Sequence, residues 1–242
     1  STAEMIKYSS ISLLATKLAF ANELGNICEK VGVDVYDVIK GVGLDSRINP
    51  SFLRAGAGFG GSCFPKDVSA LVALARAMNR RSEVLETVLG ENALQPLRLV
   101  ELTESALGDL HGKRVALLGL SFKPHTDDVR STMALRVYQA LVKMGADVVC
   151  HDPQAGPNFK ELANRRGLMD PVLAGSVEEA LEGADAAIIQ SEWPVYCELP
   201  PEKFTELMKS PVVVDGRRAF AEPQKLIDAG VTYKGIGWKG NY

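Results

Sequence analysis

The chain has 242 residues, of which 46% are hydrophobic and 24% charged, and a formal net charge of −3. That length suffices for one or two domains. The weak net charge makes nucleic acid an unexpected partner. A membrane span needs about 20 consecutive apolar residues, and no stretch approaches that length. Four scattered cysteines and three scattered histidines suggest neither a metal site nor a disulfide scaffold, so we expect a reducing, cytoplasmic location.

The first predicted element is a long helix over residues 3–31, in which apolar residues recur at spacings of three, four and seven. At 1.5 Å per residue it would be about 40 Å long, which is typical of helices that join domains or form subunit interfaces. Either role would make this helix central to the organisation of the protein. Gly32 ends it, and Asp34 caps a short second helix that continues to about Lys40.

A glycine-rich loop follows over residues 41–61, and helices are predicted to resume over residues 65–78 and 82–107. Residues 1–110 are thus expected to form an all-helical region around one functional loop.

The most informative segment is residues 58–67, GFGGSCFPKD, which places a thiol between glycines and a helix start. Pro65 suits the first helical position, and Asp67 puts an acid in the first turn. Cys63 then lies just outside a helix N-terminus with Lys66 nearby, and both features favour the thiolate. This pattern is typical of a covalent nucleophile.

The alternative for any free cysteine is that it packs as a small hydrophobic residue. We expect that role for Cys28, Cys150 and Cys197, because each lies in an apolar or strand-like run. The glycines and the turn after Cys63 favour chemistry there instead.

The pattern changes at Gly112, where short β-branched segments begin to alternate with helical ones. Strands are predicted over residues 114–120, 147–151, 184–190, 212–215 and 231–236, and the principal helices between them over residues 132–144, 177–181, 201–209 and 223–229. This alternation predicts a parallel sheet covered by helices on both faces. The fold class is therefore α + α/β, with a doubly wound, mainly parallel Rossmann-like sheet domain over residues 111–242.

Ligands of such sheets bind beyond the carboxyl ends of the strands. Two predicted strand ends carry basic residues there: Lys123, Arg130, Arg217 and Arg218. They could hold phosphates, or they could form a solvated basic rim. Neither strand end contains Gly-x-Gly-x-x-Gly, so this sheet is a poor candidate for a dinucleotide site.

Five motifs, taken in order and spacing, resemble the nucleotide-sugar 6-dehydrogenases, the UDP-glucose/GDP-mannose dehydrogenase family, over the whole chain. They are residues 3–7 (AEMIK), 20–24 (FANEL), 58–67, 122–130 (FKPHTDDVR) and 215–218 (DGRR). The resemblance implies three domains: an NAD-binding domain, a central helical dimerisation region and a nucleotide-sugar domain. It therefore also implies a homodimer through the long helix over residues 3–31. Residues 1–242 would supply the last two, so we expect a fragment that lacks the N-terminal NAD-binding domain and is inactive alone.

The resemblance also implies the reaction, a four-electron oxidation of UDP-glucose to UDP-glucuronate with NAD as the cofactor. Cys63 would capture the intermediate aldehyde as a thiohemiacetal, which is then oxidised to a thioester. Lys7 matches the family's oxyanion-stabilising lysine, and Asp67 matches the carboxylate that orders the hydrolytic water.

The binding residues implied by the resemblance divide into two sets. Those for the nucleotide sugar are Arg47, which would reach the neighbouring subunit's site, and Phe52, Leu53, Gly60, Lys123 and Arg217. Those that would meet NAD are Lys66 and Arg130.

One residue departs from the family pattern, because Ile11 stands where the family usually has an asparagine that shares the oxyanion contact. Loss of one such donor costs roughly 100- to 1000-fold in rate. Ile11 and the missing domain support one alternative, a non-catalytic, dimeric unit that binds UDP-sugars. The other alternative is a dehydrogenase of a related nucleotide sugar such as GDP-mannose, although the spacing from Arg47 to Cys63 and the loop over residues 49–53 favour UDP-glucose.

Overall fold

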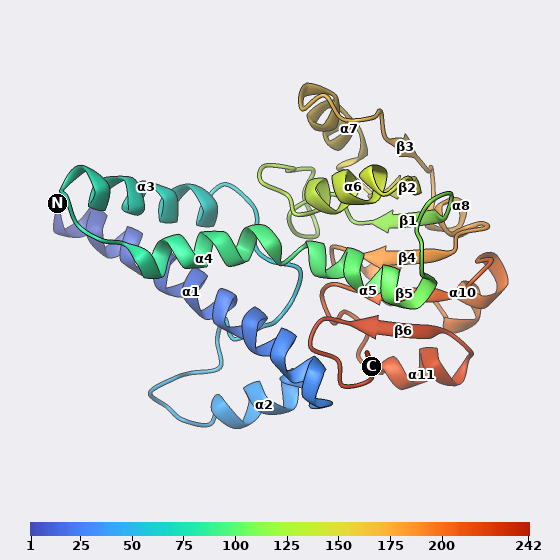
Figure 1. Cartoon of the computed structure of the whole chain (residues 1–242), viewed down its shortest axis with the longest axis horizontal. Coiled ribbons are helices and arrows are strands. Elements are labelled where there is room, and N and C mark those ends of the chain that lie inside the picture. The colour runs from blue at the N-terminus through green and yellow to red at the C-terminus, as the bar shows by residue number, and fades with distance from the viewer.

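A computed structural model describes residues 1–242 and has two parts, an elongated helical region and a compact sheet domain. Figure 1 shows the helical region on one side of the molecule and the sheet on the other, with α5 lying over the sheet. No helix combines the length and the apolar character needed to cross a bilayer. The predicted fold class is confirmed.

The helical region contains five helices: α1 (Thr2–Val31), α2 (Val35–Val42), α3 (Phe64–Ala77), α4 (Glu83–Leu94) and α5 (Leu97–Leu107). Helix α1 ends at Gly32, whose φ of 71° is left-handed, and the Asp34 side chain accepts a hydrogen bond from the Tyr36 backbone N–H at the start of α2.

The single helix expected over residues 82–107 is wrong, because the chain forms α4 and α5 with a break at Gln95 and Pro96. Proline lacks the N–H for an intrahelical bond and clashes with the preceding turn, so it starts a new helix here. The break lets α4 pack in the helical region while α5 covers the sheet (Figure 1).

The sheet has six parallel strands in the order β3-β2-β1-β4-β5-β6, the order of a doubly wound Rossmann-type sheet. The strands are β1 (Arg114–Leu118), β2 (Asp147–His151), β3 (Val172–Leu173), β4 (Ala186–Ile189), β5 (Val212–Asp215) and β6 (Thr232–Gly235). The helices between them are α6 (Ala134–Lys143), α7 (Gly156–Arg165), α8 (Val177–Leu181), α9 (Pro194–Cys197), α10 (Pro201–Leu207) and α11 (Pro223–Asp228). Sequence analysis did not predict β3, which has only two residues, nor α7 before it.

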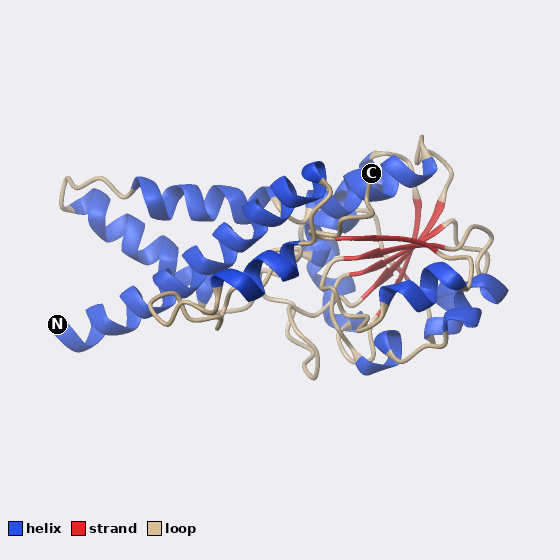
Figure 2. Cartoon of the chain, turned by 90° about the horizontal axis from the view of Figure 1, so that it is seen from below, coloured by secondary structure: helices blue, strands red, loops and turns tan.

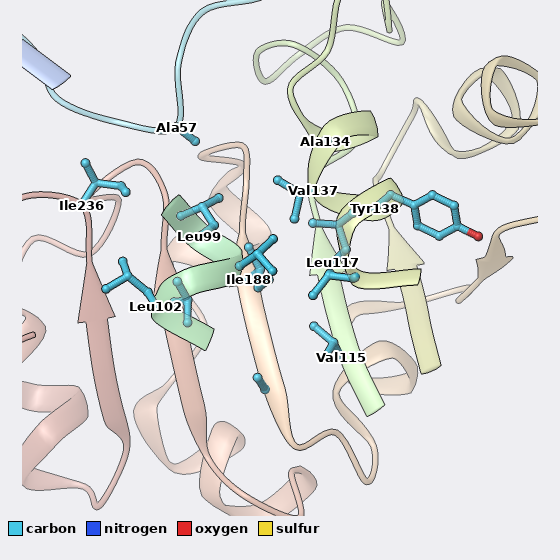
Figure 3. Packing of buried hydrophobic residues seen from close by; sticks show 14 of the residues in the cluster. Ala57, Leu99, Leu102, Val115, Leu117, Ala134, Val137, Tyr138, Ile188 and Ile236 are labelled. Atoms are coloured by element: carbon cyan, nitrogen blue, oxygen red, sulfur yellow. The ribbon is translucent and has the colours of Figure 1, made fainter. Parts of the chain in front are cut away.

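Alternate residues of the strands face two separate apolar cores. In β1, Val115 and Leu117 join a core with α5 and α6, whereas Ala116 and Leu118 face α8, α10 and α11. Figure 2 shows the sheet edge-on between these two helical layers, and Figure 3 shows Leu99 and Leu102 of α5 beside Ile188 of β4. The same core includes Ala57 of the glycine-rich loop, so that loop is anchored to the sheet domain.

The two parts are joined where the C-terminal end of α1 meets the segment after β6. The Gly237 backbone N–H donates to Glu29 at 2.7 Å, and its carbonyl accepts from the Val35 N–H at 3.0 Å. A buried ion pair joins Arg218 to Asp34 at 2.9 Å. These contacts fix the direction of α1 relative to the sheet, and therefore the position of the loop between them.

Candidate active site

A cavity lies between the helical region and the carboxyl ends of the sheet strands. The arrowheads of β1, β4 and β6 point toward the helical region in Figure 1, and the loop between α2 and α3 passes through this gap. The cavity has a volume of about 720 Å³ and is lined by most of residues 52–64, by Leu18 and Asn22 of α1, and by residues of the sheet loops. That volume is in the range of small-molecule sites.

Cys63 is the N-cap residue of α3 and its side chain is exposed to this cavity. The Asp67 backbone N–H donates to the Cys63 carbonyl at 2.8 Å, which starts the helix. Helix α3 begins at Phe64, so Pro65 occupies the second helical position rather than the first. The thiol therefore lies at the positive end of a helix dipole, where a thiolate is stabilised.

The other three cysteines lie in environments that disfavour a thiolate. Cys28 and Cys150 are buried and Cys197 is half-buried. Burial raises the pKa of all three thiols, that of Cys197 to about 12. Cys63 is thus the one exposed thiol of the chain.

Asp67 brings the N-terminal half of α1 next to the start of α3. Its side chain is buried and pairs with Lys66, and its Oδ2 lies 3.3 Å from Lys7 Nζ. The hydrogen bond from Lys66, followed by the pairing with Lys7, holds the pKa of the Asp67 carboxyl below its ordinary value against the opposing effect of burial. Lys7 and Asp67, 60 positions apart in the sequence, are therefore neighbours.

Arg130 approaches the same loop from the sheet domain. Its carbonyl accepts the Gly61 N–H at 2.9 Å, and its guanidinium pairs with Asp128 at 2.7 Å. The pKa of Arg130 is raised first by that pairing and also by the nearby Cys63 thiol. Lys66 and Arg130, both more than half exposed, thus flank Cys63 on the outside of the cavity.

Charged residues from the sheet loops and the glycine-rich loop also line the cavity. Lys123 follows β1 and Arg217 follows β5. Arg217 donates to the carbonyls of Gln190 and Gly58, each at 2.9 Å, and burial lowers its pKa. Glu192 lies 3.1 Å from Arg54 and 3.8 Å from Arg217. Arg217 therefore both supports the loop and contributes positive charge.

The remaining predicted site residues occupy different surroundings. Phe52 and Gly60 line the cavity, whereas the Leu53 side chain is buried in the core that α5 shares with the sheet. Arg47 pairs with Asp45 at 2.6 Å and points to solvent, with 87% of its side chain exposed. It does not line the cavity of its own chain.

Sequence reasoning missed three polar residues that line the cavity: Asn22, Arg54 and Glu192. Glu192 comes three residues after the end of β4, so the strand-end rule that selected Lys123 could have found it. Asn22 lies 15 residues after Lys7 on the same helix. Arg54 directly follows the predicted Phe52 and Leu53, and nothing in the local pattern distinguishes it.

Ile11 lies one turn after Lys7 and is partly buried. It packs against a small apolar cluster that includes Ala15, Phe59 and Val68. The position that holds an amide in the resembled family is thus filled here by hydrocarbon in contact with the wall of the cavity.

Two family models match the chain. The UDP-glucose/GDP-mannose dehydrogenase family, central domain, matches residues 1–93, and the UDP binding domain of the same family matches residues 116–222. Together they account for most of the helical region and most of the sheet domain.

Individual proteins show the same similarity. The chain is 45% identical to the UDP-glucose 6-dehydrogenase AglM of Haloferax volcanii over 93% of its length and 41% identical to the UDP-glucose 6-dehydrogenase TuaD of Bacillus subtilis over 98%. The chain covers 51% and 50% of these relatives, respectively, so it spans about half of their length.

Solved structures agree with these relatives. A UDP-glucose dehydrogenase from Pyrobaculum islandicum superposes with a TM-score of 0.85 at 37% identity, over 98% of this chain and 51% of the other. An NDP-N-acetyl-D-galactosaminuronic acid dehydrogenase from Methanosarcina mazei gives the same TM-score at 27% identity, over 99% and 51%.

Proposed function

The chain belongs to the UDP-glucose/GDP-mannose dehydrogenase family, and we propose that it forms the thiol-bearing, sugar-nucleotide-binding part of a UDP-glucose 6-dehydrogenase. The proposed reaction is the NAD-dependent, four-electron oxidation of UDP-glucose to UDP-glucuronate. The observation that carries it is the exposed Cys63 thiol at a helix N-terminus, opening into a 720 Å³ cavity that Lys123 and Arg217 also line. Its location is proposed to be cytoplasmic, as the four free cysteines suggest.

The two parts of the fold have different proposed roles. We assign residues 1–110 to the central dimerisation region and residues 111–242 to UDP-sugar binding. No Gly-x-Gly-x-x-Gly turn follows any strand of the sheet, so the proposal places the NAD-binding fold outside residues 1–242. Lys66 and Arg130 suit contacts to the cofactor, because both are exposed cations beside Cys63. Two NAD⁺ molecules, bound one after the other, would each accept one of the two hydrides that the oxidation releases.

Cys63 acts on the aldehyde that the first oxidation produces. Its thiolate adds to the aldehyde carbon, a C–S bond forms, and the carbonyl oxygen becomes an oxyanion. Lys7 supplies a fixed positive charge for that oxyanion. Loss of hydride from the adduct restores the carbonyl and leaves a thioester on Cys63.

Asp67 serves the last step, in which water attacks the thioester carbon. The buried carboxylate accepts a hydrogen bond from Lys66 and forms an ion pair with Lys7, and it stays ionised because the two lysines lower its pKa. It therefore orients the water and accepts its proton. The C–S bond breaks, the uronate leaves, and Cys63 returns as the thiolate.

The part of the cavity that basic side chains line suits a diphosphate and a uridine. Lys123 and Arg217 place two cations at the carboxyl ends of β1 and β5, and Arg54 adds a third beside Glu192. Guanidinium groups match phosphate geometry well. Phe52 contributes an aromatic wall. The substrate would extend from these cations to the thiol.

Dimerisation through α1 is supported by an exposed apolar stripe. Ile6, Leu13, Phe20 and Ile27 repeat every seven residues, and between 54% and 63% of each residue is exposed. A heptad repeat of apolar residues is typical of a helix that packs along a partner helix. Arg47, which points away from its own cavity, would then reach the site of the second copy.

The test is turnover in the full-length enzyme, measured as NADH formation with UDP-glucose. The Cys63→Ala variant is expected to lose at least about 1000-fold in kcat, because the second oxidation requires the covalent adduct. The matched control is Cys197→Ala, which removes a half-buried thiol outside the cavity lining and should retain activity within about twofold. If Cys63→Ala still produced two NADH per UDP-glucose at the wild-type rate, the covalent mechanism would be disproved.

Ile11 favours a second candidate, a non-catalytic unit that binds UDP-sugars, because an apolar side chain replaces the expected donor. Calorimetry with UDP-glucose and with GDP-mannose distinguishes the substrates for either candidate. Eight curated relatives, at 38–45% identity, carry the name UDP-glucose 6-dehydrogenase, which favours UDP-glucose.

A further inference from the structure

Three buried carboxamide side chains hold the glycine-rich loop through hydrogen bonds to its backbone. Asn22 of α1, Asn92 of α4 and Gln95 at the end of α4 are each only 5–6% exposed. None of them entered the sequence-based site. Buried amides of this kind persist only where their hydrogen bonds are satisfied, so their partners show what they hold.

Asn92 holds both backbone groups of a single residue. Its Oδ1 accepts the Phe59 N–H at 2.7 Å, and its Nδ2 donates to the Phe59 carbonyl at 2.9 Å. Two bonds to one residue fix the orientation of the peptide units on both sides of it. The loop therefore cannot rotate at Phe59 without breaking a bond to Asn92.

Gln95 and Asn22 hold the loop three residues earlier. Gln95 Nε2 donates to the Gly56 carbonyl at 2.9 Å, and Asn22 Oδ1 accepts the Gly56 N–H at 2.8 Å. Gln95 is itself oriented by Asn26, which donates to its Oε1 at 2.9 Å. Asn92 and Gln95 are three positions apart, so they lie on one face of the chain at the end of α4.

The glycines allow this close seating. A Cβ on Gly58, whose φ is +87°, would lie 2.9 Å from Asn92 Oδ1, and one on Gly60 would lie 2.3 Å from the Ser131 carbonyl oxygen. Any side chain at these positions would push the loop away from α4 or from the sheet loop. The glycines are thus needed for the hydrogen bonds between the amides and the loop as much as for access to the thiol.

Asn92 holds the loop at Phe59, which is nearer to Cys63 in the chain than Gly56 is. The Phe59 ring packs edge-to-face on Phe64 with centroids 5.5 Å apart, and Phe64 directly follows Cys63. The Gly61 N–H is held by the Arg130 carbonyl at 2.9 Å. Displacement of Phe59 would therefore be passed to the residue next to the thiol.

The part of the loop at Gly56 lies beside Arg217, a basic residue that lines the cavity. A Cβ on Gly56 would be 3.5 Å from an Arg217 guanidinium nitrogen. We propose that Asn92 is a positioning residue that holds the Cys63 thiol for attack, whereas Gln95 and Asn22 position the substrate-binding end of the same loop. This inference rests on the proposed function, because it assigns the thiol a reaction.

The first test needs neither substrate nor cofactor. Amide hydrogen exchange is measured on the 242-residue chain for wild type, Asn92→Leu and the control Asn164→Leu, which removes an exposed amide bonded to Asp170. Asn92→Leu is expected to accelerate exchange of residues 56–61 at least tenfold and to leave the remainder of α4 protected. Uniform acceleration over α4 and the sheet would indicate a general folding role and would overturn the inference.

The second test is the kinetics of the full-length enzyme. Asn92→Leu should lower kcat by about 10- to 100-fold with less than a threefold change in KM, whereas Gln95→Leu should raise KM for UDP-glucose more than it lowers kcat. A kcat of Asn92→Leu within threefold of wild type, or the same kinetic change in both variants, would overturn the assignment.

Asn92→Asp provides a further readout if the leucine variant does not fold. Its carboxylate cannot donate to the Phe59 carbonyl, but the protonated form can, as the amide does. Relative to wild type at the same pH, its kcat should rise as pH falls from 8 to 6. A ratio that does not change with pH would contradict the positioning role.

The proposed function and the positioning role of Asn92 can be disproved separately. If wild-type enzyme does not oxidise UDP-glucose, the proposed function is wrong, and hydrogen exchange still shows whether Asn92 holds the loop. If the enzyme is active but Asn92→Leu turns over normally, only the positioning inference is wrong.

Discussion

Asp67 is the residue whose surroundings distinguish it most clearly from an ordinary surface acid. It is buried at the first turn of α3, and two lysines from different helices pair with it. Each lysine is more than half exposed, so solvent screens the pairing and the stabilisation stays modest. The arrangement keeps a carboxylate ionised in the turn that follows Cys63, as water activation requires.

The pH dependence of stability tests this reading of Asp67. Because its pKa is lower in the folded chain than the ordinary value of about 3.9, it stabilises the fold above pH 4, and that contribution is lost as pH falls through the folded pKa. Asp67→Asn should cost about 1 kcal/mol at pH 7, and the difference from wild type should shrink below pH 4. Urea unfolding at pH 7, 5 and 3 measures the free energy of unfolding of both proteins. A difference between wild type and Asp67→Asn that grows toward pH 3 would contradict the predicted pH dependence.

Ile11 offers a prediction in the opposite direction, a gain of activity. Ile11→Asn restores a donor one turn after Lys7, and kcat of the full-length enzyme should rise about tenfold or more. The polar group enters an apolar cluster, so thermal stability should fall. Ile11→Val, which keeps the apolar character, is the control. Unchanged or lower turnover of the asparagine variant, with the fold intact, would show that the site does not use this position.

At the scale of elements, the order and type of the main helices and strands follow from the sequence. The period of α1, the alternation after Gly112 and the turn at residues 63–67 all predict what the structure contains. Local patterns failed at two places: β3 has only two residues and is too short to produce a pattern, and only Gln95 and Pro96 separate α4 from α5, so the two helices look like one.

The candidate site was predictable only in part for the same reason. Cys63, Lys123 and Arg217 stand at recognisable places, a helix start and two strand ends. The proximity of Lys7 to Asp67 depends on how α1 packs against α3, and no spacing rule gives it. Asn92 and Gln95 look like ordinary polar positions of a helix until the loop is seen to lie on them.

The contact between α1, α2 and the segment after β6 yields an element-scale prediction. A Cβ on Gly237, where φ is +67°, would lie 2.2 Å from Val35 Cγ1. Gly237→Ala should therefore cost roughly 2–4 kcal/mol, from the backbone conformation and the overlap together. Gly183 has nearly the same φ, +68°, with open space around it, so Gly183→Ala should cost about 1 kcal/mol. Equal denaturant midpoints for the two variants would contradict the close packing.

At the scale of the whole molecule, the exposed stripe on α1 predicts self-association. Sedimentation equilibrium of the wild-type chain should give twice the 26.1 kDa mass of one chain. Leu13→Asp places a charge in the centre of the stripe and should weaken the dimer at least tenfold. Met169→Asp, which changes an exposed apolar residue of the sheet domain, should not. A wild-type monomer at micromolar concentration would count against the proposed interface.

The covalent adduct is the most direct test of the whole account. Full-length protein carrying Asp67→Asn, in which hydrolysis should be slowed, is mixed with UDP-glucose and NAD, quenched in acid and digested. The peptide that contains Cys63 is expected to carry the acyl group of the oxidised UDP-sugar as a thioester, and the peptides of the other three cysteines should be unmodified. NADH formation with an unmodified Cys63 peptide at every time point would contradict the role assigned to this thiol.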